Sequence, residues 1–230
     1  MLEKLAKGRY LNFDMTVPKL TYELESFVTQ PKMSLTLTQS VKEKVSVKPY
    51  DVTQNMLDGS RTVAQKQRVS SFNAGEAQKK IHRNFQWLYY YGGAVNEVSY
   101  DNIDVLSGNF SGCWMMVYRK NGIQYVGHVG TVDDPTTKHS IAAKKAWNKF
   151  ASENKNDVIR GFSPAKAWPP EDVPDKIDGD GLARIWGLVT TDRLVSVYLY
   201  RGDKDWNRYR IADVKDDIPT AHKSTLCALP

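Results

Sequence analysis

The sequence predicts a single α+β domain built on a core of mixed or antiparallel strands. Its 230 residues are 41% hydrophobic and 25% charged, which is typical of a globular chain long enough to bury one good core. Several segments alternate apolar and polar residues with the period of a strand, and two others repeat apolar residues at helical spacing. We therefore expect one domain over residues 1–230, with residues 1–30 as a candidate N-terminal extension.

The first half of the chain contains one predicted hairpin and one predicted helix. Residues 33–53 alternate Leu35 with Leu37 and then Val45 with Val47, which predicts an early β-hairpin. Residues 73–91 open with an Asn-to-Glu capping pattern and end at two glycines, which predicts an amphipathic helix. The apolar residues of this helix are Ala77, Ile81, Phe85 and Leu88.

A second hairpin follows in the middle of the chain. Residues 113–118 (CWMMVY) and 123–129 (IQYVGHV) are strand-prone runs separated by a turn signal that contains Asn121-Gly122. A two-residue turn pairs Lys120 with Ile123 and places Met115 opposite His128, so that Cys113 lies diagonal to His128 on the same face. A four-residue loop puts the two directly opposite, whereas a three-residue loop separates them.

The remaining segments supply one helix, one loop and more sheet. Residues 140–151 predict a helix whose apolar face carries Ala143, Ala146, Trp147 and Phe150. Residues 161–181 concentrate proline, glycine and acids, which predicts a long surface loop that either edges the site, contacts a protein substrate or is simply solvated. Residues 182–190 and 194–200 then predict another hairpin.

The shared face of Cys113 and His128 carries the chemistry. A free thiol has a pKa of about 8.5, and only the thiolate is a strong nucleophile. An imidazole with β-carbons about 5–8 Å away can stabilise the thiolate as an ion pair and return the proton to a leaving group. The hypothesis requires both groups on one face, at a mouth open to solvent. The alternative is a buried structural cysteine beside an unrelated histidine.

The stretch from Ser111-Gly112-Cys113 to Thr131 resembles the catalytic hairpin of glutamine deamidase toxins of the cytotoxic necrotizing factor and Burkholderia lethal factor type. That family has a Leu-Ser-Gly-Cys motif followed by a histidine on the next strand. Here Phe110 replaces the leucine, the Ser-Gly-Cys part matches, and His128 stands where the family's histidine is expected. The resemblance covers residues 105–131.

The resemblance implies a β-sandwich core flanked by helices, no metal and no cofactor. It also implies conversion of a glutamine of a host protein to glutamate, with Cys113 as nucleophile and His128 as its proton-transfer partner. In the family a backbone carbonyl orients the histidine. By analogy with the lethal factor, Ser107 is the candidate for the orienting group here, and Asn109, Asp104 and Asp133 are alternatives.

The backbone beside the nucleophile is the candidate oxyanion site. Ser111 and Gly112 are small enough for a substrate to approach the main chain closely, and N–H groups there can hold the developing negative charge.

Composition narrows the partners. The two cysteines form no CxxC pair, so neither a zinc site nor a disulfide framework is indicated. The net charge of +6 is spread along the chain without a nucleic-acid motif, and no apolar run spans a bilayer. We expect no nucleic acid, no membrane and no cleavable signal peptide. The expected protein is a monomeric secreted bacterial effector, which acts on a host protein in the host cytoplasm.

Three classes of function remain open at this point. The first is the deamidase, with a Rho-type GTPase or a translation factor as target. The second keeps the thioester chemistry but forms a transglutaminase or a cysteine protease. The third is a non-enzymatic basic protein-binding module in which Cys113 only packs.

Overall fold

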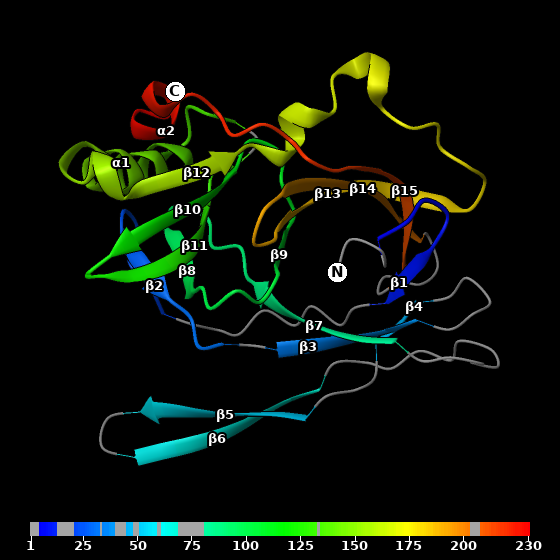
Figure 1. Ribbon diagram of the computed structural model, residues 1–230, viewed down its shortest axis with the longest axis horizontal. Helices are drawn as coiled ribbons and strands as arrows, with labels where there is room; N and C mark the ends of the chain where they lie inside the picture. The colour runs from blue at the N-terminus through cyan, green and yellow to red at the C-terminus, as the bar shows by residue number, and fades with distance from the viewer. Residues whose placement is uncertain are drawn as a thin grey trace.

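The computed structural model describes residues 5–12, 21–32, 34–39, 45–47, 51–58, 61–68, 81–132, 134–202 and 208–230. Side chains are described outside residues 12 and 34–84 of these ranges. Strands are the commonest secondary structure among the described residues, and two α-helices complete the architecture (Figure 1).

Two mixed sheets form the body of the protein. The larger has eight strands in the order β1-β15-β14-β13-β9-β7-β3-β4, and only β7 and β9 pair in parallel. Their bounds are β1 Tyr10–Asn12, β3 Ser34–Gln39, β4 Val45–Val47, β7 Ile81–Leu88, β9 Val105–Gly108, β13 Asp180–Val189, β14 Leu194–Gly202 and β15 Arg208–Lys215.

The second sheet has five strands in the order β12-β10-β11-β8-β2, with β2 and β8 parallel. Their bounds are β2 Phe27–Thr29, β8 Val95–Ser99, β10 Trp114–Lys120, β11 Ile123–Val129 and β12 Val158–Phe162. A separate hairpin joins β5 (Asp51–Asp58) to β6 (Arg61–Arg68) and lies apart from both sheets in Figure 1.

The two sheets pack face to face, as the sequence predicts for a sandwich-like α+β fold. One buried cluster contains Leu88 and Val105 from the large sheet together with Met115, Val117 and Val126 from the small one. The opposite face of the large sheet curls around a second cluster, which includes Trp87, Trp186 and Val197 (Figure 1). Strands β9 and β14 of the large sheet are buried along nearly their whole length, so they are largely apolar on both faces.

Helix α1 (Lys138–Glu153) covers the other face of the small sheet, where the sequence predicts a helix. Thr137 caps it by accepting a hydrogen bond from Ser140 N at 3.2 Å. Ala143, Ala146 and Trp147 are buried as expected, and helix α2 (Lys223–Cys227) packs beside them (Figure 1). Within the part of the chain that the structure describes, no helix is long and apolar enough to cross a membrane.

Both predicted hairpins around residues 113–129 and 182–200 are confirmed. Met115 pairs with His128 and Lys120 with Ile123, the register of a two-residue turn at Asn121-Gly122. Val189 pairs with Leu194 in the later hairpin. The early hairpin is confirmed as well, because Leu37 of β3 pairs with Val47 of β4.

The predicted helix ending at Gly92-Gly93 is wrong where the structure describes it. Residues 81–88 form strand β7, and residues 73–80 lie outside the described residues. Phe85 and Trp87 face the curled cluster, whereas Leu88 faces the sandwich. A spacing of four residues fits a helix and also fits one face of a strand. When both faces of a strand are buried, apolar residues also occur at the positions between, and the combined spacing resembles that of a helix.

The predicted surface loop over residues 161–181 is only partly a surface loop. Its first residues belong to β12, and 3₁₀ turns follow at Pro164–Ala167 and Pro170–Asp172, after an earlier one at Lys155–Asp157. Trp168 is buried against Tyr198 of β14, and its Nε1 donates to Ser196 Oγ at 2.7 Å. The proline-rich composition predicted a loop, whereas part of this segment packs on the outer face of the large sheet. The exposed part of the segment is residues 170–179.

The close approach of β9 to β13 requires glycine at position 108. Gly108 pairs with Trp186, and a Cβ at Gly108 would lie 2.1 Å from Trp186 Cδ1. We predict that Gly108→Ala lowers the free energy of unfolding by about 1–3 kcal/mol, because the buried indole must shift. Chemical denaturation measures this change. Gly112→Ala is the control, since its added Cβ meets nothing nearer than 3.4 Å, and an equal loss in both variants would contradict the argument.

Candidate functional site

The candidate site lies where the chain crosses from one sheet of the sandwich to the other. Strand β9 of the large sheet carries Ser107, and strand β11 of the small sheet carries His128. The connection over residues 109–113 passes between them and delivers Cys113 immediately before β10. Three residues predicted from sequence therefore come from a strand of each sheet and from the loop that joins those sheets.

His128 and Cys113 face the interior of the sandwich together. Cys113 belongs to the same buried cluster as Phe110 and Met115, and the ring of Phe110 stacks on His128 with centroids 4.2 Å apart. The side chains of Trp114 and Met116 belong instead to the cluster under α1. The sequence-based expectation that thiol and imidazole share one face is therefore met.

Ser107 is the residue that contacts the imidazole. Its Oγ donates a hydrogen bond to the carbonyl oxygen of Leu88 at 2.7 Å and lies 2.8 Å from His128 Nδ1. A hydroxyl has one proton, and a carbonyl can only accept. Ser107 Oγ must then accept from Nδ1–H, which leaves Nε2 as the unprotonated nitrogen. Nε2 is buried and finds no hydrogen-bond partner among the described residues.

The carbonyl behind Ser107 could not be identified from sequence. Leu88 ends β7, which pairs in parallel with β9 and aligns Leu88 with Ser107. The pattern of side chains carries no signal for this contact, because the acceptor is a backbone atom and its strand was predicted as a helix. The histidine is thus held by a relay of Leu88 O, Ser107 Oγ and Nδ1.

The other candidates for the orienting group have different positions. Asn109 is exposed, and its Oδ1 accepts a hydrogen bond from Trp186 Nε1 at 3.1 Å. Asp104 precedes β9, and its carbonyl accepts from Gln86 N at 2.8 Å. Asp133 lies outside the described residues.

The mouth of the site is closed. Cys113 is 1% exposed and His128 is fully buried, so the expectation of a mouth open to solvent is wrong for this conformation. Ser111 and Gly112 are exposed above the thiol, and within the described chain their backbone N–H groups find no hydrogen-bond acceptor. The lid over the site is therefore a short glycine-containing loop.

Burial also decides the charges in this conformation. It lowers the pKa of His128 from 6.5 to about 3, because a charged imidazolium loses its hydration there. The Cys113 thiol donates to the carbonyl oxygen of Thr131 at 3.0 Å. The closed site therefore holds a neutral imidazole, and the thiol acts there as a hydrogen-bond donor.

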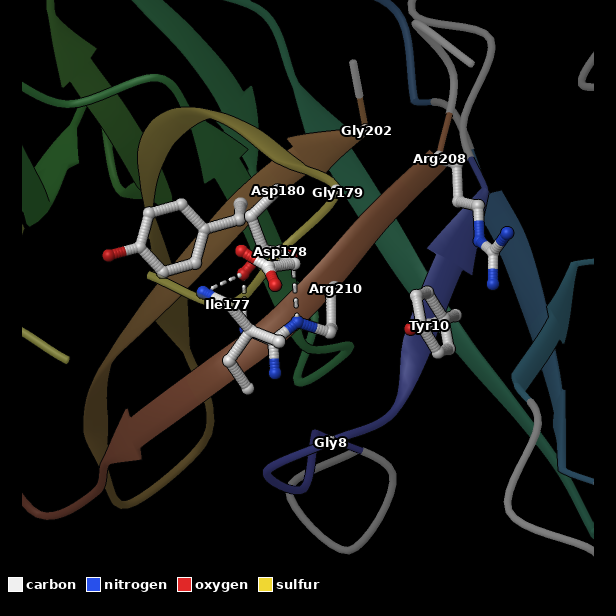
Figure 2. Close-up of a pocket in the computed structure, with 10 residues that line it drawn as sticks. Gly8, Tyr10, Ile177, Asp178, Gly179, Asp180, Gly202, Arg208 and Arg210 are labelled. Atoms are coloured by element: carbon white, nitrogen blue, oxygen red, sulfur yellow. Dashed lines mark hydrogen bonds and ion pairs between the residues drawn. The ribbon is translucent and has the colours of Figure 1, made fainter. Parts of the chain in front are cut away.

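A cavity of about 610 Å³ opens elsewhere, at the far end of the large sheet. It is lined near β1 and β15 by Tyr10 and Arg208, whose guanidinium lies 4.0 Å from the Tyr10 ring (Figure 2). Arg210 bonds Asp180 through two nitrogens; burial alone raises the pKa of Asp180, but these hydrogen bonds lower it overall. Asp180 is seven residues from Gly187, the pairing partner of Ser107, or roughly 20 Å along β13.

The described part of the protein contains no cluster of potential metal ligands. No three His, Cys, Asp or Glu side chains there come together as potential ligands. Cys113 and Cys227 form no disulfide.

The tautomer of His128 is directly measurable. We predict that a long-range ¹H–¹⁵N spectrum at neutral pH shows Nδ1 protonated and Nε2 unprotonated. Ser107→Ala removes the acceptor for Nδ1–H, and the Nε2–H form should then gain population. A wild-type spectrum with Nε2 protonated would contradict the relay.

The lowered pKa of His128 also makes the stability of the fold depend on pH. The unfolded state binds a proton near pH 6.5, whereas the folded state does so only near pH 3. Stability is therefore complete above about pH 6.5 and falls by up to about 1.4 kcal/mol per unit below it. Urea denaturation at several pH values should show this slope in the wild type and a shallower one in His128→Asn. Parallel curves for the two proteins would refute the assignment.

Two comparisons with known proteins were negative. No protein-family model matches the chain, and a search of curated proteins finds no match. The functional conclusion therefore depends on the sequence motif and on the geometry of the site.

Proposed function

We propose that this protein is a glutamine deamidase with Cys113 as nucleophile, His128 as general base and acid, and Ser107 as the group that orients the imidazole. One observation supports this proposal most: the Ser107 hydroxyl fixes Nδ1 as the protonated nitrogen and leaves Nε2 with an unused lone pair. This is the tautomer that a base beside a cysteine nucleophile needs.

The reaction follows from these positions. Nε2 takes the thiol proton as Sγ attacks the carboxamide carbon, and the carbonyl electron pair moves to oxygen. The tetrahedral intermediate collapses, and ammonia leaves with the proton returned by Nε2. Water then attacks the thioester, gives a proton to Nε2 and releases glutamate, while the thiol is restored.

The closed conformation is the resting state of this enzyme. Burial keeps His128 neutral at pH 7 but makes it a weak base, because its pKa is lowered to about 3. The imidazole becomes an effective base when the site opens and water hydrates it. The glutamine side chain reaches Sγ after the exposed residues Ser111 and Gly112 move aside. Phe110 stays in place, because its N–H donates to the carbonyl oxygen of Ile185 at 2.8 Å. His128 and Ser107 lie on strands, so this movement leaves their hydrogen bond in place.

The substrate class comes from the resemblance to the toxin family. We assign a host protein as substrate, either a Rho-type GTPase or a translation factor, and a secreted effector that acts in the host cytoplasm. Transglutaminase and protease reactions share the thioester step. Deamidation differs from them in its products, because it releases ammonia without cross-links or chain scission.

The burial of Cys113 favours a second candidate function, the non-enzymatic binding module. In that case the thiol only packs and donates to Thr131 O, and partners use the open cavity lined by Tyr10 and Arg208. The two candidates differ in the expected effect of replacing Cys113. For a binding module, this replacement leaves every activity intact.

Mass spectrometry of host lysate proteins treated with the purified protein tests the deamidase. We expect one glutamine of a target to gain the mass that accompanies replacement of its amide NH2 by OH. Cys113→Ser should abolish the change, and Ser107→Ala should slow it by about ten- to hundredfold, equivalent to about 1–3 kcal/mol of lost hydrogen bonding.

Cys227→Ser is the matched control, since Cys227 lies on α2 away from the site and should leave the rate unchanged. Equal modification by the wild type and Cys113→Ser would rule out the mechanism. Cross-linked or cleaved target would replace deamidation by one of the related reactions.

A further inference from the structure

Within the part of the chain that the structure describes, two buried polar atoms of the candidate site have no hydrogen-bond partner. They are Nε2 of His128 and Oγ1 of Thr131, a residue that is 2% exposed. Nearly all buried hydroxyls in proteins are hydrogen-bonded, because an unpaired one loses its hydration without gaining a partner. The proposed reaction uses Nε2, but it gives no role to the Thr131 hydroxyl.

Thr131 lies against both the thiol and the loop that precedes it. Its carbonyl oxygen accepts the Cys113 thiol at 3.0 Å, just after the end of β11. A Cβ at Gly112 would lie 3.4 Å from Thr131 Oγ1, so the hydroxyl sits beside the main chain of Gly112. The N–H of Gly112 also finds no acceptor within the described chain. The two unused donors therefore belong to the residue that accepts the thiol and to the residue that precedes Cys113.

We infer that Thr131 is a further catalytic residue, whose hydroxyl donates a hydrogen bond to the oxyanion that forms when Cys113 attacks a carbonyl carbon. This inference rests on the proposed function of Cys113. Attack moves a pair of electrons onto the carbonyl oxygen, and donors already in place stabilise that charge without reorganisation. Nε2 lacks a proton when attack begins, so it cannot fill this role. Thr131 Oγ1 can, because Thr131 lies just after the end of β11 and outside the loop that moves.

The alternative role for Thr131 is structural, and Thr190 shows how such a hydroxyl looks. Thr190 is 6% exposed, its Oγ1 donates to Asp192 Oδ1 at 2.9 Å, and it accepts from Arg193 N at 2.9 Å. Replacing Thr190 by valine leaves partners unsatisfied and should destabilise the fold. Thr131→Val keeps the side-chain shape and removes an unpaired hydroxyl, so the free energy of unfolding should stay the same or rise.

Acylation by p-nitrophenyl acetate tests the inference without knowledge of the natural target. The thiolate attacks the ester carbon, an oxyanion forms, and its collapse expels p-nitrophenolate and leaves a thioester on Cys113. We expect a burst of one nitrophenolate per enzyme in the wild type. The burst rate should fall by about 10²–10³-fold in Thr131→Val and remain near the wild-type rate in Thr131→Ser, which keeps the hydroxyl.

The outcomes separate the two levels of the argument. A wild-type burst rate in Thr131→Val overturns the role of Thr131 and leaves Cys113 as nucleophile, provided that Cys113→Ser shows no burst. Identical traces for the wild type and Cys113→Ser overturn the proposed function, and the role of Thr131 falls with it. A loss of stability in Thr131→Val as large as that in Thr190→Val assigns the hydroxyl to folding and also overturns the inference.

Discussion

The hydrogen bond between Ser107 and His128 joins the two sheets of the sandwich, and the rest of the site depends on it. Ser107 Oγ donates to the carbonyl oxygen of Leu88 in its own sheet, so the position of this oxygen does not depend on His128. The stacked ring of Phe110 then fixes the plane of His128. Packing between the sheets thus sets both the tautomer and the orientation of a titratable group. Small changes in how the sheets meet will act on the chemistry through this one contact.

Burial disfavours both halves of the proposed reaction. A dry interior keeps the imidazole neutral but makes it a weak base, and it also disfavours the thiolate that attack requires. The closed state therefore holds the proposed base and the proposed nucleophile in unreactive forms. In the proposed mechanism, opening the loop over Cys113 admits substrate and water together, and a hydrated imidazole can then carry the proton. This protects the thiol when no substrate is bound, because a thiol is less reactive than a thiolate.

The sequence predicts the parts of the site that side chains specify. An Asn-Gly turn fixes the pairing of Met115 with His128, and period-two alternation places Cys113 on the same face. The strand at residues 81–88 was missed because burial on both faces imitates helical spacing. Because this segment was predicted as a helix, the sequence could not indicate that the carbonyl oxygen of Leu88 accepts the Ser107 hydroxyl. The closure of the mouth is also beyond the sequence, since it depends on how a five-residue crossing packs between two sheets.

The placement of each group on a strand or a loop explains how one site can be both rigid and accessible. His128 and Ser107 lie on strands that are paired within sheets. Nearby, the absence of a side chain at Gly108 leaves room for Trp186, and its absence at Gly187 leaves room for Met115 and Phe110. Cys113, by contrast, ends a loop whose exposed residues make few hydrogen bonds. We therefore expect the movement that admits the proposed substrate to be confined to this loop. Thr131 lies just after the end of β11, so its oxygen atoms adjoin both the small sheet and the loop before Cys113.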